Sequence, residues 1–514
     1  MRIMNCPSGF VGRFSRIRLY VLLMTFSAVF LTSCPTSAQS SGIFNSNSDV
    51  GQTRHGGAAR FVRESNEYRI TGGGENMWGE KDAFQYLRKK VSGDLSLTAK
   101  IRWLGEGKNA HRKAGWMIRQ DLAEDSSYVD AVVHGDGLTC LQFRKTKGGQ
   151  TEEIQSPIPA PAFIRLERHA EVFSLSVSED GKVFLPAGAV SVALENPVYV
   201  GLAVCSHDDK ITETAIFSHV DMKSLGTYKK EDRMIESTLE IISAQTGRRS
   251  IVYRSRRHFE APNWSRNGKY LLFNSGGRLY TIPVSGGEPV QLNTDFADRC
   301  NNDHGFSPDG RMLAISHHNE GKSLIYVLPG GGGIPRLVTK LGPSYWHGWS
   351  SDGKTLAYCA ERNANYDIYA IPVDGGRETR LTDAEGLDDG PDYSPDGRYI
   401  YLNSERTGAM KILRMNSDGT DQIQVTNDDE YADWFPHPSP DGRQIVFLSY
   451  DSDVKGHPAN KDVALRIMPS SGGKTRVLTR LFGGQGTINV PSWSPDSKYI
   501  AFVSYRLVGK DSDN

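Results

Sequence analysis

The sequence has no excess of charge of either sign, few cysteines and only one long apolar run. Its 514 residues carry 60 basic and 60 acidic side chains, so the whole-chain composition gives no sign of a nucleic-acid-binding protein. The apolar run, residues 19–31, is too short to cross a bilayer. No Gly-x-Ser-x-Gly motif precedes a helical pattern, which argues against a serine hydrolase of the α/β type.

The apolar run instead indicates an export signal, which we place at residues 1–38. Three arginines precede the run and small residues follow it, as in secretory signals. Two processing sites compete. Thr36-Ser37-Ala38 fits cleavage before Gln39, whereas Leu31-Thr32-Ser33-Cys34 resembles a bacterial lipobox that would leave Cys34 lipidated. We therefore expect a periplasmic, outer-membrane or secreted protein, whose only membrane attachment would be a lipid at Cys34.

A short phrase recurs six times in the C-terminal half of the chain. In its fullest form it is Ser-Pro-Asp-Gly, and an aromatic residue or a proline precedes the serine. The six serines are Ser265, Ser307, Ser350, Ser394, Ser439 and Ser494, and the spacing between them is 42 to 55 residues. A turn signal that returns every 40 to 45 residues is typical of a β-propeller.

Each copy predicts one four-stranded blade. The Pro-Asp-Gly turn follows the first strand and leads to an apolar second strand such as 270–273. A third strand such as 279–284 ends at Gly-Gly, and a short outer strand follows it. The sixth copy lacks its last two strands. Residues 239–243 and 250–253 have the missing pattern, so we expect this segment to close a six-bladed ring and remove its open edges.

These repeats resemble those of TolB-like propellers. The similarity rests on the Ser-Pro-Asp-Gly turns and on the Ile-Pro-Val-x-Gly-Gly hairpins at 282–287 and 371–376, and it covers residues 237–508. It implies a six-bladed propeller and an envelope protein with a protein or polysaccharide partner. A propeller is a platform for many activities, so the function has to be argued from its site.

Residues 57–222 predict a separate all-β unit. Alternating strands such as 95–101 and 173–177 indicate a two-sheet sandwich, flanked by linkers at 39–56 and 223–236. The phrases Met77-Trp78-Gly79 and Gly115-Trp116-Met117-Ile118-Arg119 resemble concanavalin-like jelly rolls, which implies carbohydrate binding. Carboxylates at the spacing used by the hydrolases of that group are missing. The fold class expected for the whole chain is therefore all-β, with a concanavalin-like sandwich before the propeller.

Departures from the repeat gather at one face of the predicted propeller. The Pro-Asp-Gly turns mark the bottom, so the loops before the first strand and between the second and third strands share the top. Three residues before the turn serine, four copies have proline but the second and third have His304 and His347. The other candidate ligand-binding residues at the top are Asp303, Trp346, Asp388, Asp389, Trp434, His437, Lys455, His457, Lys461 and Gln485. A polar concavity of this kind is a candidate binding site.

Two functions fit this top face. The first is binding of a polysaccharide or an envelope protein, with Lys455 and Lys461 as a clamp for carboxylates. The alternative is a structural role, in which these lysines pair with Asp388, Asp389 and Asp433 and hold the loop shut. The second function comes from a resemblance to oligogalacturonate lyases, TolB-like propellers that hold a metal with His and Gln side chains. In that case His304 and His347 would bind a divalent metal, with His437 and Gln485 as further ligands, although a His-x-His pair at the mouth is missing.

Four cysteines lie beyond the signal: Cys140, Cys205, Cys300 and Cys359. Export would permit disulfides, and adjacent predicted blades carry Cys300 and Cys359 on the same face, so these two could form a bridge. The alternative is four isolated buried thiols.

Overall fold

The computed structural model describes residues 41–226 and 233–509. The predicted signal, the lipobox and part of the second predicted linker lie outside these ranges. The described residues belong to one compact unit. Every regular element of the described residues is a β-strand, and within them no helix is long and apolar enough to span a bilayer. The all-β prediction is confirmed.

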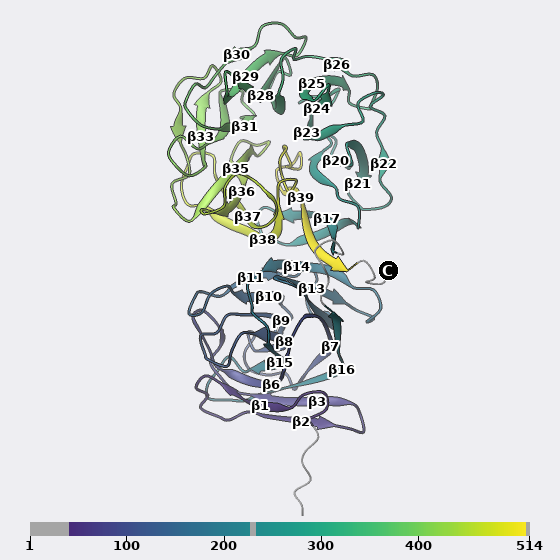
Figure 1. Ribbon diagram of the computed structural model, residues 1–514, viewed down its shortest axis with the longest axis vertical. Helices are drawn as coiled ribbons and strands as arrows, with labels where there is room; N and C mark the ends of the chain where they lie inside the picture. Colours follow the sequence, from purple (N-terminus) through teal and green to yellow (C-terminus); the bar gives the residue numbers. More distant parts are fainter. Residues whose placement is uncertain (1–40, 227–232, 510–514) are drawn as a thin grey trace, which may run out of the picture. The chain divides into compact units, whose positions relative to one another are not determined.

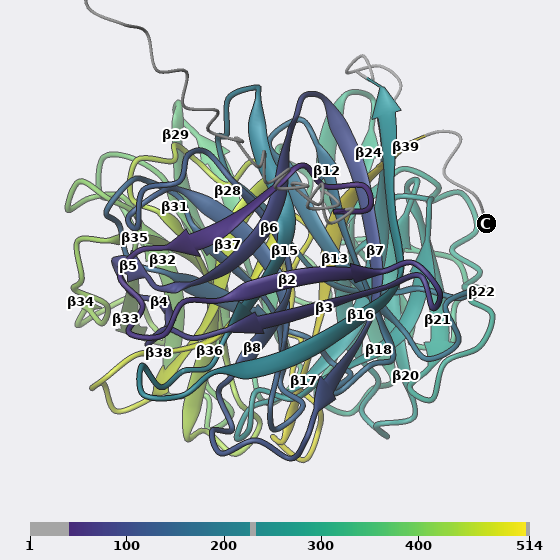
Figure 2. The ribbon, with the colours of Figure 1, turned by 90° about the horizontal axis from the view of Figure 1, so that it is seen from below.

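The N-terminal half of the described chain is a sandwich of two seven-stranded antiparallel sheets (Figure 1). The first sheet has the order β1 (Ser46–Val50), β6 (Phe84–Val91), β15 (Val198–Cys205), β8 (Lys113–Arg119), β9 (Tyr128–His134), β10 (Thr139–Arg144) and β11 (Glu152–Gln155). The second has the order β14 (Leu185–Ser191), β13 (Val172–Ser178), β12 (Phe163–His169), β7 (Asp94–Leu104), β16 (Glu213–Gly226), β3 (Glu67–Gly72) and β2 (Ala58–Val62). A small ribbon, β4 (Met77–Trp78) with β5 (Lys81–Asp82), accompanies them. Figure 2 shows β2, β3 and β16 side by side at the edge of the second sheet.

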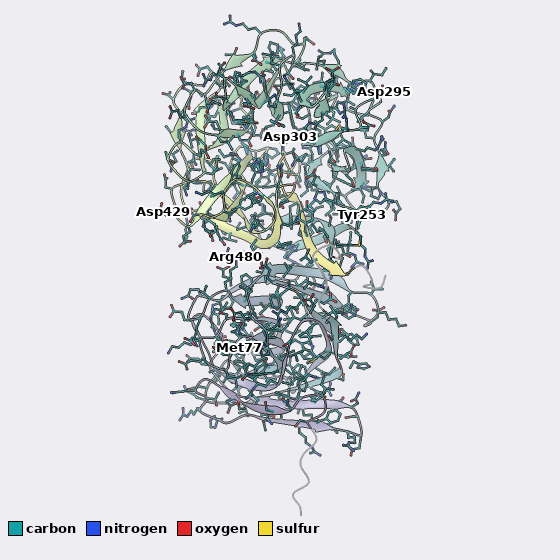
Figure 3. The ribbon with its side chains drawn as sticks, viewed as in Figure 1. Met77, Tyr253, Asp295, Asp303, Asp429 and Arg480 are labelled. Atoms are coloured by element: carbon teal, nitrogen blue, oxygen red, sulfur yellow. The ribbon has the colours of Figure 1, made fainter. Side chains whose placement is uncertain are left out.

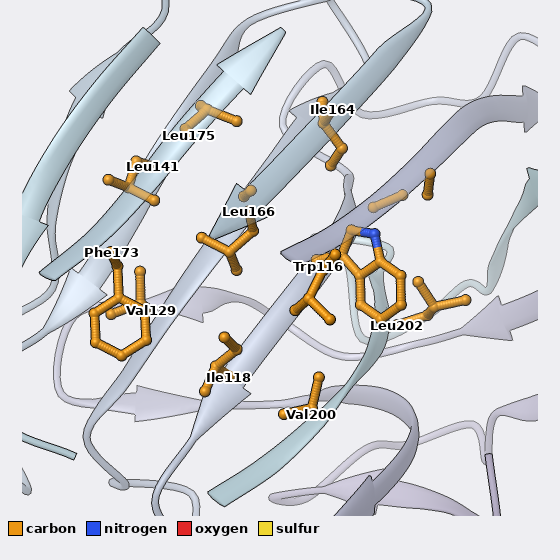
Figure 4. Close-up of a cluster of buried hydrophobic side chains, with 14 of the residues drawn as sticks. Trp116, Ile118, Val129, Leu141, Ile164, Leu166, Phe173, Leu175, Val200 and Leu202 are labelled. Carbon is orange, nitrogen blue, oxygen red and sulfur yellow. The ribbon is translucent and has the colours of Figure 1, made fainter. Parts of the chain in front are cut away.

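Alternate residues of these strands meet between the sheets and form the sandwich core. Trp116, Ile118 and Leu141 from the first sheet face Leu166 and Phe173 from the second (Figure 4), and all five are buried. Alternate residues of each strand point into this core, as the alternating sequence predicts, although β8, β10 and β13 are buried on both faces. Strand β1 lies inside the stretch predicted to be a linker, where pairing with β6 holds it in place.

The C-terminal half is a ring of six blades around a central axis (Figure 1). The first three blades are β19–β22 (Glu260–Trp264, Tyr270–Ser275, Arg278–Pro283, Val290–Gln291), β23–β26 (Cys300–Phe306, Met312–Asn319, Lys322–Pro329, Arg336–Leu337) and β27–β30 (Ser344–Trp349, Thr355–Arg362, Asn365–Pro372, Thr379–Arg380). The next two are β31–β34 (Asp388–Tyr393, Tyr399–Ser404, Lys411–Asn416, Ile423–Gln424) and β35–β38 (Tyr431–Pro438, Gln444–Asp451, Ala459–Pro469, Arg476–Gly484).

The sixth blade joins the two ends of the propeller sequence. Strand β39 (Tyr499–Gly509) pairs along its whole length with β17 (Arg233–Ser243), which in turn pairs with β18 (Arg249–Ser255). An isolated bridge, Trp493 to Ile500, adds the innermost strand. The predicted ring closure by the N-terminal segment is confirmed. The bridge between Cys300 and Cys359 does not form, because all four described cysteines are buried thiols.

The repeated turns share one set of hydrogen bonds. In the second blade Ser307 Oγ donates to Asp309 Oδ1 at 2.7 Å, and the Met312 amide donates to Ser307 Oγ at 3.0 Å. The glycine that ends the turn, Gly310, has a left-handed φ of 72°, which a side chain would disfavour. Five copies have glycine at this position, and the sixth has Ser497 at φ 61°.

The sandwich and the propeller contact each other within the compact unit. Asp462 of β37 accepts a hydrogen bond from the Ser191 backbone amide at 2.9 Å. It also forms an ion pair with Lys145 at 2.9 Å. Arg480 of β38 pairs with Glu152 at 2.9 Å. The long hairpin of the fifth blade therefore serves partly to hold the sandwich.

Candidate functional site

The innermost strands of the first five blades each carry a bulge near the top of the ring. In three blades a proline lies three residues before the turn serine, and the residue before that proline has a left-handed φ. These residues are Ala261 (56°), Gly390 (62°) and Phe435 (53°). The two blades with histidine differ. In the third blade His347 is itself the bulged residue, whereas in the second the shift falls within 301–303, before His304. The two histidines therefore occupy different positions although their sequence spacing is the same.

Five side chains from four blades and one loop form what we call the mouth group: Glu260, Asp303, His347, Asp389 and His457. The Nε2 atom of His347 lies 3.2 Å from Asp389 Oδ1. Asp303 lies close enough to interact with His347, Asp389 and Glu260, and its carboxylate accepts a hydrogen bond from the Asn301 amide at 2.6 Å. Figure 3 places Asp303 toward the centre of the ring.

The His347–Asp389 pair is ionised in the folded chain. Burial opposes the charge on His347, yet the carboxylate of Asp389, helped by Asp303, raises its pKa to about 9. Burial likewise opposes the charge on Asp389, but the imidazolium of His347 lowers its pKa to about 2. Because each charge depends on the other, the pair acts as one unit.

Among the described residues, Glu260 forms no ion pair, and Asp303 shares His347 with Asp389. Burial, with repulsion from Asp389, raises the pKa of Asp303 to about 6 against the pull of His347. Burial and the neighbouring Asp303 raise the pKa of Glu260 to about 7. The mouth group can therefore exchange protons near neutral pH.

The loop between β36 and β37 covers the mouth group. His457 lies against Trp434 and Phe435, with ring centroids 4.6 Å and 5.3 Å apart, and Phe435 stacks on His347 at 6.1 Å. Burial lowers the pKa of His457. Aromatic rings thus cover the mouth group on this side.

Three predicted site residues lie apart from the mouth group. His304 is fully buried beside the backbone of Ala261 and Leu272, and burial lowers its pKa to about 3. His437 is held by Asp392 Oδ2 at 3.1 Å and by the Ile488 carbonyl at 2.7 Å. Trp346 is buried against Gly305, where a Cβ would lie 2.2 Å from its ring. These three are packing residues of the ring.

The acidic residues predicted at the rim have cationic partners within the propeller. Asp388 pairs with Arg406 at 2.6 Å, and Asp433 pairs with Arg466 at 3.2 Å. Lys455 and Lys461 are exposed, and within the described part of the chain neither forms an ion pair. The alternative in which these lysines pair with the rim aspartates is therefore wrong. Gln485 lies beside the same loop, and its backbone amide donates a hydrogen bond to the Pro458 carbonyl at 3.3 Å.

The donor set does not suit the metal predicted for His304 and His347. In residues 41–226 and 233–509 no three histidine, cysteine or acidic side chains converge in a way that could hold a metal ion. The two histidines have different neighbours, and His347 already uses Nε2 on Asp389.

Sequence reasoning missed Glu260, Phe435 and the two arginines. Glu260 stands one residue before a bulge, at the position that Asp389 occupies in the fourth blade, so aligning the bulges would have found it. Arg406 follows β32, the second strand of the fourth blade, and Arg466 lies within β37, the third strand of the fifth. Their contacts with Asp388 and Asp433 could not be predicted from the repeat pattern.

The family follows from comparisons with known proteins. A model described as the TolB beta propeller domain, PD40, matches residues 347–483. An uncharacterized protein of Agrobacterium fabrum is 54% identical over 273 residues, which are 53% of this chain and 93% of that protein. The chain belongs to the TolB-like propeller family.

Two further relatives support this placement. A solved structure from Agrobacterium tumefaciens, provisionally assigned as a TolB, is 53% identical with a TM-score of 0.52, and the match covers 53% of this chain and 99% of that one. The Tol-Pal system protein TolB of Francisella tularensis subsp. mediasiatica is 26% identical over 46% of this chain and 54% of that protein. The chain thus spans about half the length of the Francisella protein.

Proposed function

We propose that this TolB-like propeller is an exported binding protein of the cell envelope that recognises an acidic polysaccharide at its top face. The observation that supports this is the state of the charges around the mouth. The acids of the rim are neutralised by Arg406, Arg466 and His347, whereas Lys455 and Lys461 are exposed without an ion pair among the described residues.

Lys455 and Lys461 can therefore bind an anionic ligand, although the exposed Asp453 lies on the same loop. An ammonium group donates charge-assisted hydrogen bonds to carboxylates, which are stronger than neutral ones. Two lysines on one loop can engage two carboxylates of a repeating chain, so affinity grows with chain length. The predicted signal at residues 1–38 would bring the protein to the compartment where such polymers occur.

The test is a binding measurement with defined polymers. Calorimetry would compare polygalacturonate and alginate with neutral dextran, for the native chain and for the double variant Lys455→Gln/Lys461→Gln. The matched control is Lys269→Gln/Lys354→Gln, which changes two exposed lysines at the opposite, bottom turns. We expect the loop variant to lose at least tenfold in affinity for the acidic polymers while its melting temperature stays within about 2 °C.

Two results would count against the proposal. Equal affinity for dextran and the acidic polymers would remove the role of charge. Binding to an isolated envelope protein that depends on these lysines, with no binding to any polymer, would assign the top face to a protein partner instead.

A further inference from the structure

A second concavity lies away from the mouth, between the outer face of the second sandwich sheet and the sixth blade. It has a volume of about 590 Å³, a size typical of small-molecule sites. Strands β7, β12 and β16 line one wall, and β17, β18 and β39 line the other. We call it the domain cleft.

The domain cleft is rich in basic side chains. Six basic residues line it, against three acidic ones: Arg165, Lys182, Lys223, Arg254, Arg256 and Arg506, against Glu167, Asp221 and Glu236. The acidic residues are already engaged. Arg506 lies 2.7 Å from Glu236 and 3.7 Å from Glu167, and Lys223 lies 3.5 Å from Asp221. The remaining charge in the domain cleft is positive.

Two arginines converge on Phe184 from opposite walls. The Arg165 guanidinium lies 3.7 Å from the centre of the Phe184 ring, and its Nε donates to Thr98 Oγ1 at 3.2 Å. Arg254 donates through Nη1 to the Phe184 carbonyl at 2.7 Å. Among the described residues, the two Nη atoms of Arg165 and the Nη2 and Nε atoms of Arg254 make no hydrogen bond. Burial lowers the pKa of Arg165, against the opposing effect of the Glu167 carboxylate.

We infer that the domain cleft binds a sugar that carries one anionic oxo group, with the anion between Arg165 and Arg254. A guanidinium presents paired N–H donors that match a carboxylate or a phosphate. The stack on Phe184 fixes the plane of the Arg165 fork and so preorganises it.

The remaining lining suits the hydroxyl groups of such a sugar. Thr98, Ser96 and Ser255 offer hydroxyls that both donate and accept. The cavity volume exceeds what a bare anion needs and accommodates a mono- or disaccharide. Because the two walls belong to different domains, the ligand would also hold the sandwich against the propeller.

The experiment uses the whole exported chain and four probes: glucuronate, glucose 6-phosphate, glucose and inorganic phosphate. Calorimetry or ligand-observed NMR would give the affinity of each. We expect glucuronate, glucose 6-phosphate or both to bind at least tenfold more tightly than glucose and than inorganic phosphate. The comparison between the first two tells a uronic acid from a sugar phosphate.

Variants then locate the binding. Arg165→Gln and Arg254→Gln should each weaken the preferred probe about tenfold or more. Since Arg165 is partly buried, Lys182→Gln, at an exposed position of the same lining, serves as a variant that cannot disturb the fold, and it should weaken binding several-fold. The matched control is Arg69→Gln, an exposed arginine of β3 in the same sheet that does not line the domain cleft.

The inference is overturned if no probe binds saturably. It is also overturned if glucose or inorganic phosphate binds as tightly as the anionic sugars, or if Arg69→Gln has the same effect as Lys182→Gln. The variant Lys455→Gln/Lys461→Gln keeps this test separate from the proposed function, because adding Arg165→Gln to it should still weaken the preferred probe about tenfold.

Discussion

His347 Nε2 lies 3.2 Å from Asp389 Oδ1, and both side chains are largely buried at the centre of the propeller. The two residues come from the innermost strands of neighbouring blades, β27 and β31. A buried ion pair of this kind is costly to break, because removal of one partner leaves an unpaired charge away from water.

The first prediction concerns this pair. Asp389→Asn should reduce the free energy of unfolding by about 3 kcal/mol near pH 6, since the imidazolium of His347 would lose its counter-charge. Urea unfolding at several pH values measures the effect. The matched control is Asp209→Asn, which changes an exposed aspartate of the sandwich and should leave the stability unchanged.

The pH dependence of this loss has a definite sign. The pKa of His347 is raised from 6.5 to about 9, so its stabilisation is complete below pH 6.5 and disappears as the pH rises through 9. The pKa of Asp389 is lowered from 3.8 to about 2, so its stabilisation holds above pH 3.8 and disappears as the pH falls through 2. The variant should therefore differ most from the native chain between pH 4 and 6.5. An equal loss at pH 6 and pH 10 would contradict the ion pair.

A second prediction concerns Glu260, whose effect has the opposite direction. Its pKa is raised from 4.5 to about 7 by burial and by Asp303, so the folded chain disfavours its ionised form, and stability falls as the pH rises through this range. Glu260→Gln should raise the free energy of unfolding at pH 8, by on the order of 2 kcal/mol, and change little at pH 4. Glu288→Gln, at an exposed loop position, is the control. A loss of stability at pH 8 would show that the carboxylate is needed.

The sequence repeat predicted most of the fold but few of the contacts in the candidate site. Turn chemistry is local, so the Ser-Pro-Asp-Gly phrase was enough to predict blades, their faces and the closing segment 239–253. Strand β1 was missed because its Ser- and Asn-rich sequence has no strand signal, and its pairing with β6 decides its structure.

The site depends on bulges, which the repeat does not encode. The same spacing placed His304 and His347 in one predicted position, yet the register shifts at different residues in the two blades and only His347 joins the mouth group. Partners such as Arg406 for Asp388 are also set by side-chain reach across a blade. Such contacts are tertiary, and a single sequence gives no direct signal for them.

A third prediction tests the turn. Gly310 has φ 72°, and an added Cβ would lie 3.3 Å from Arg266, so Gly310→Ala should cost about 1 kcal/mol of stability. Gly331→Ala is the matched control, because that glycine has no left-handed φ and open space around it. Chemical denaturation compares the two. Equal stability of both variants would show that the turn tolerates a side chain.

The last prediction concerns the closure of the ring. Strand β17 pairs with β39 along its length, from Arg233 opposite Gly509 to Ser243 opposite Tyr499, and a buried ion pair between Glu240 and Arg249 at 2.7 Å links β17 to β18. A propeller chain that begins at residue 258 lacks both strands, and β39 then becomes an open edge that can pair with other molecules. We expect this chain to aggregate or to lose cooperative unfolding, as measured by light scattering and thermal denaturation. A propeller chain that begins at residue 233 is the control and should remain monomeric. If the shorter chain is equally soluble and melts at the same temperature, the pairing of β17 with β39 is not what closes the ring.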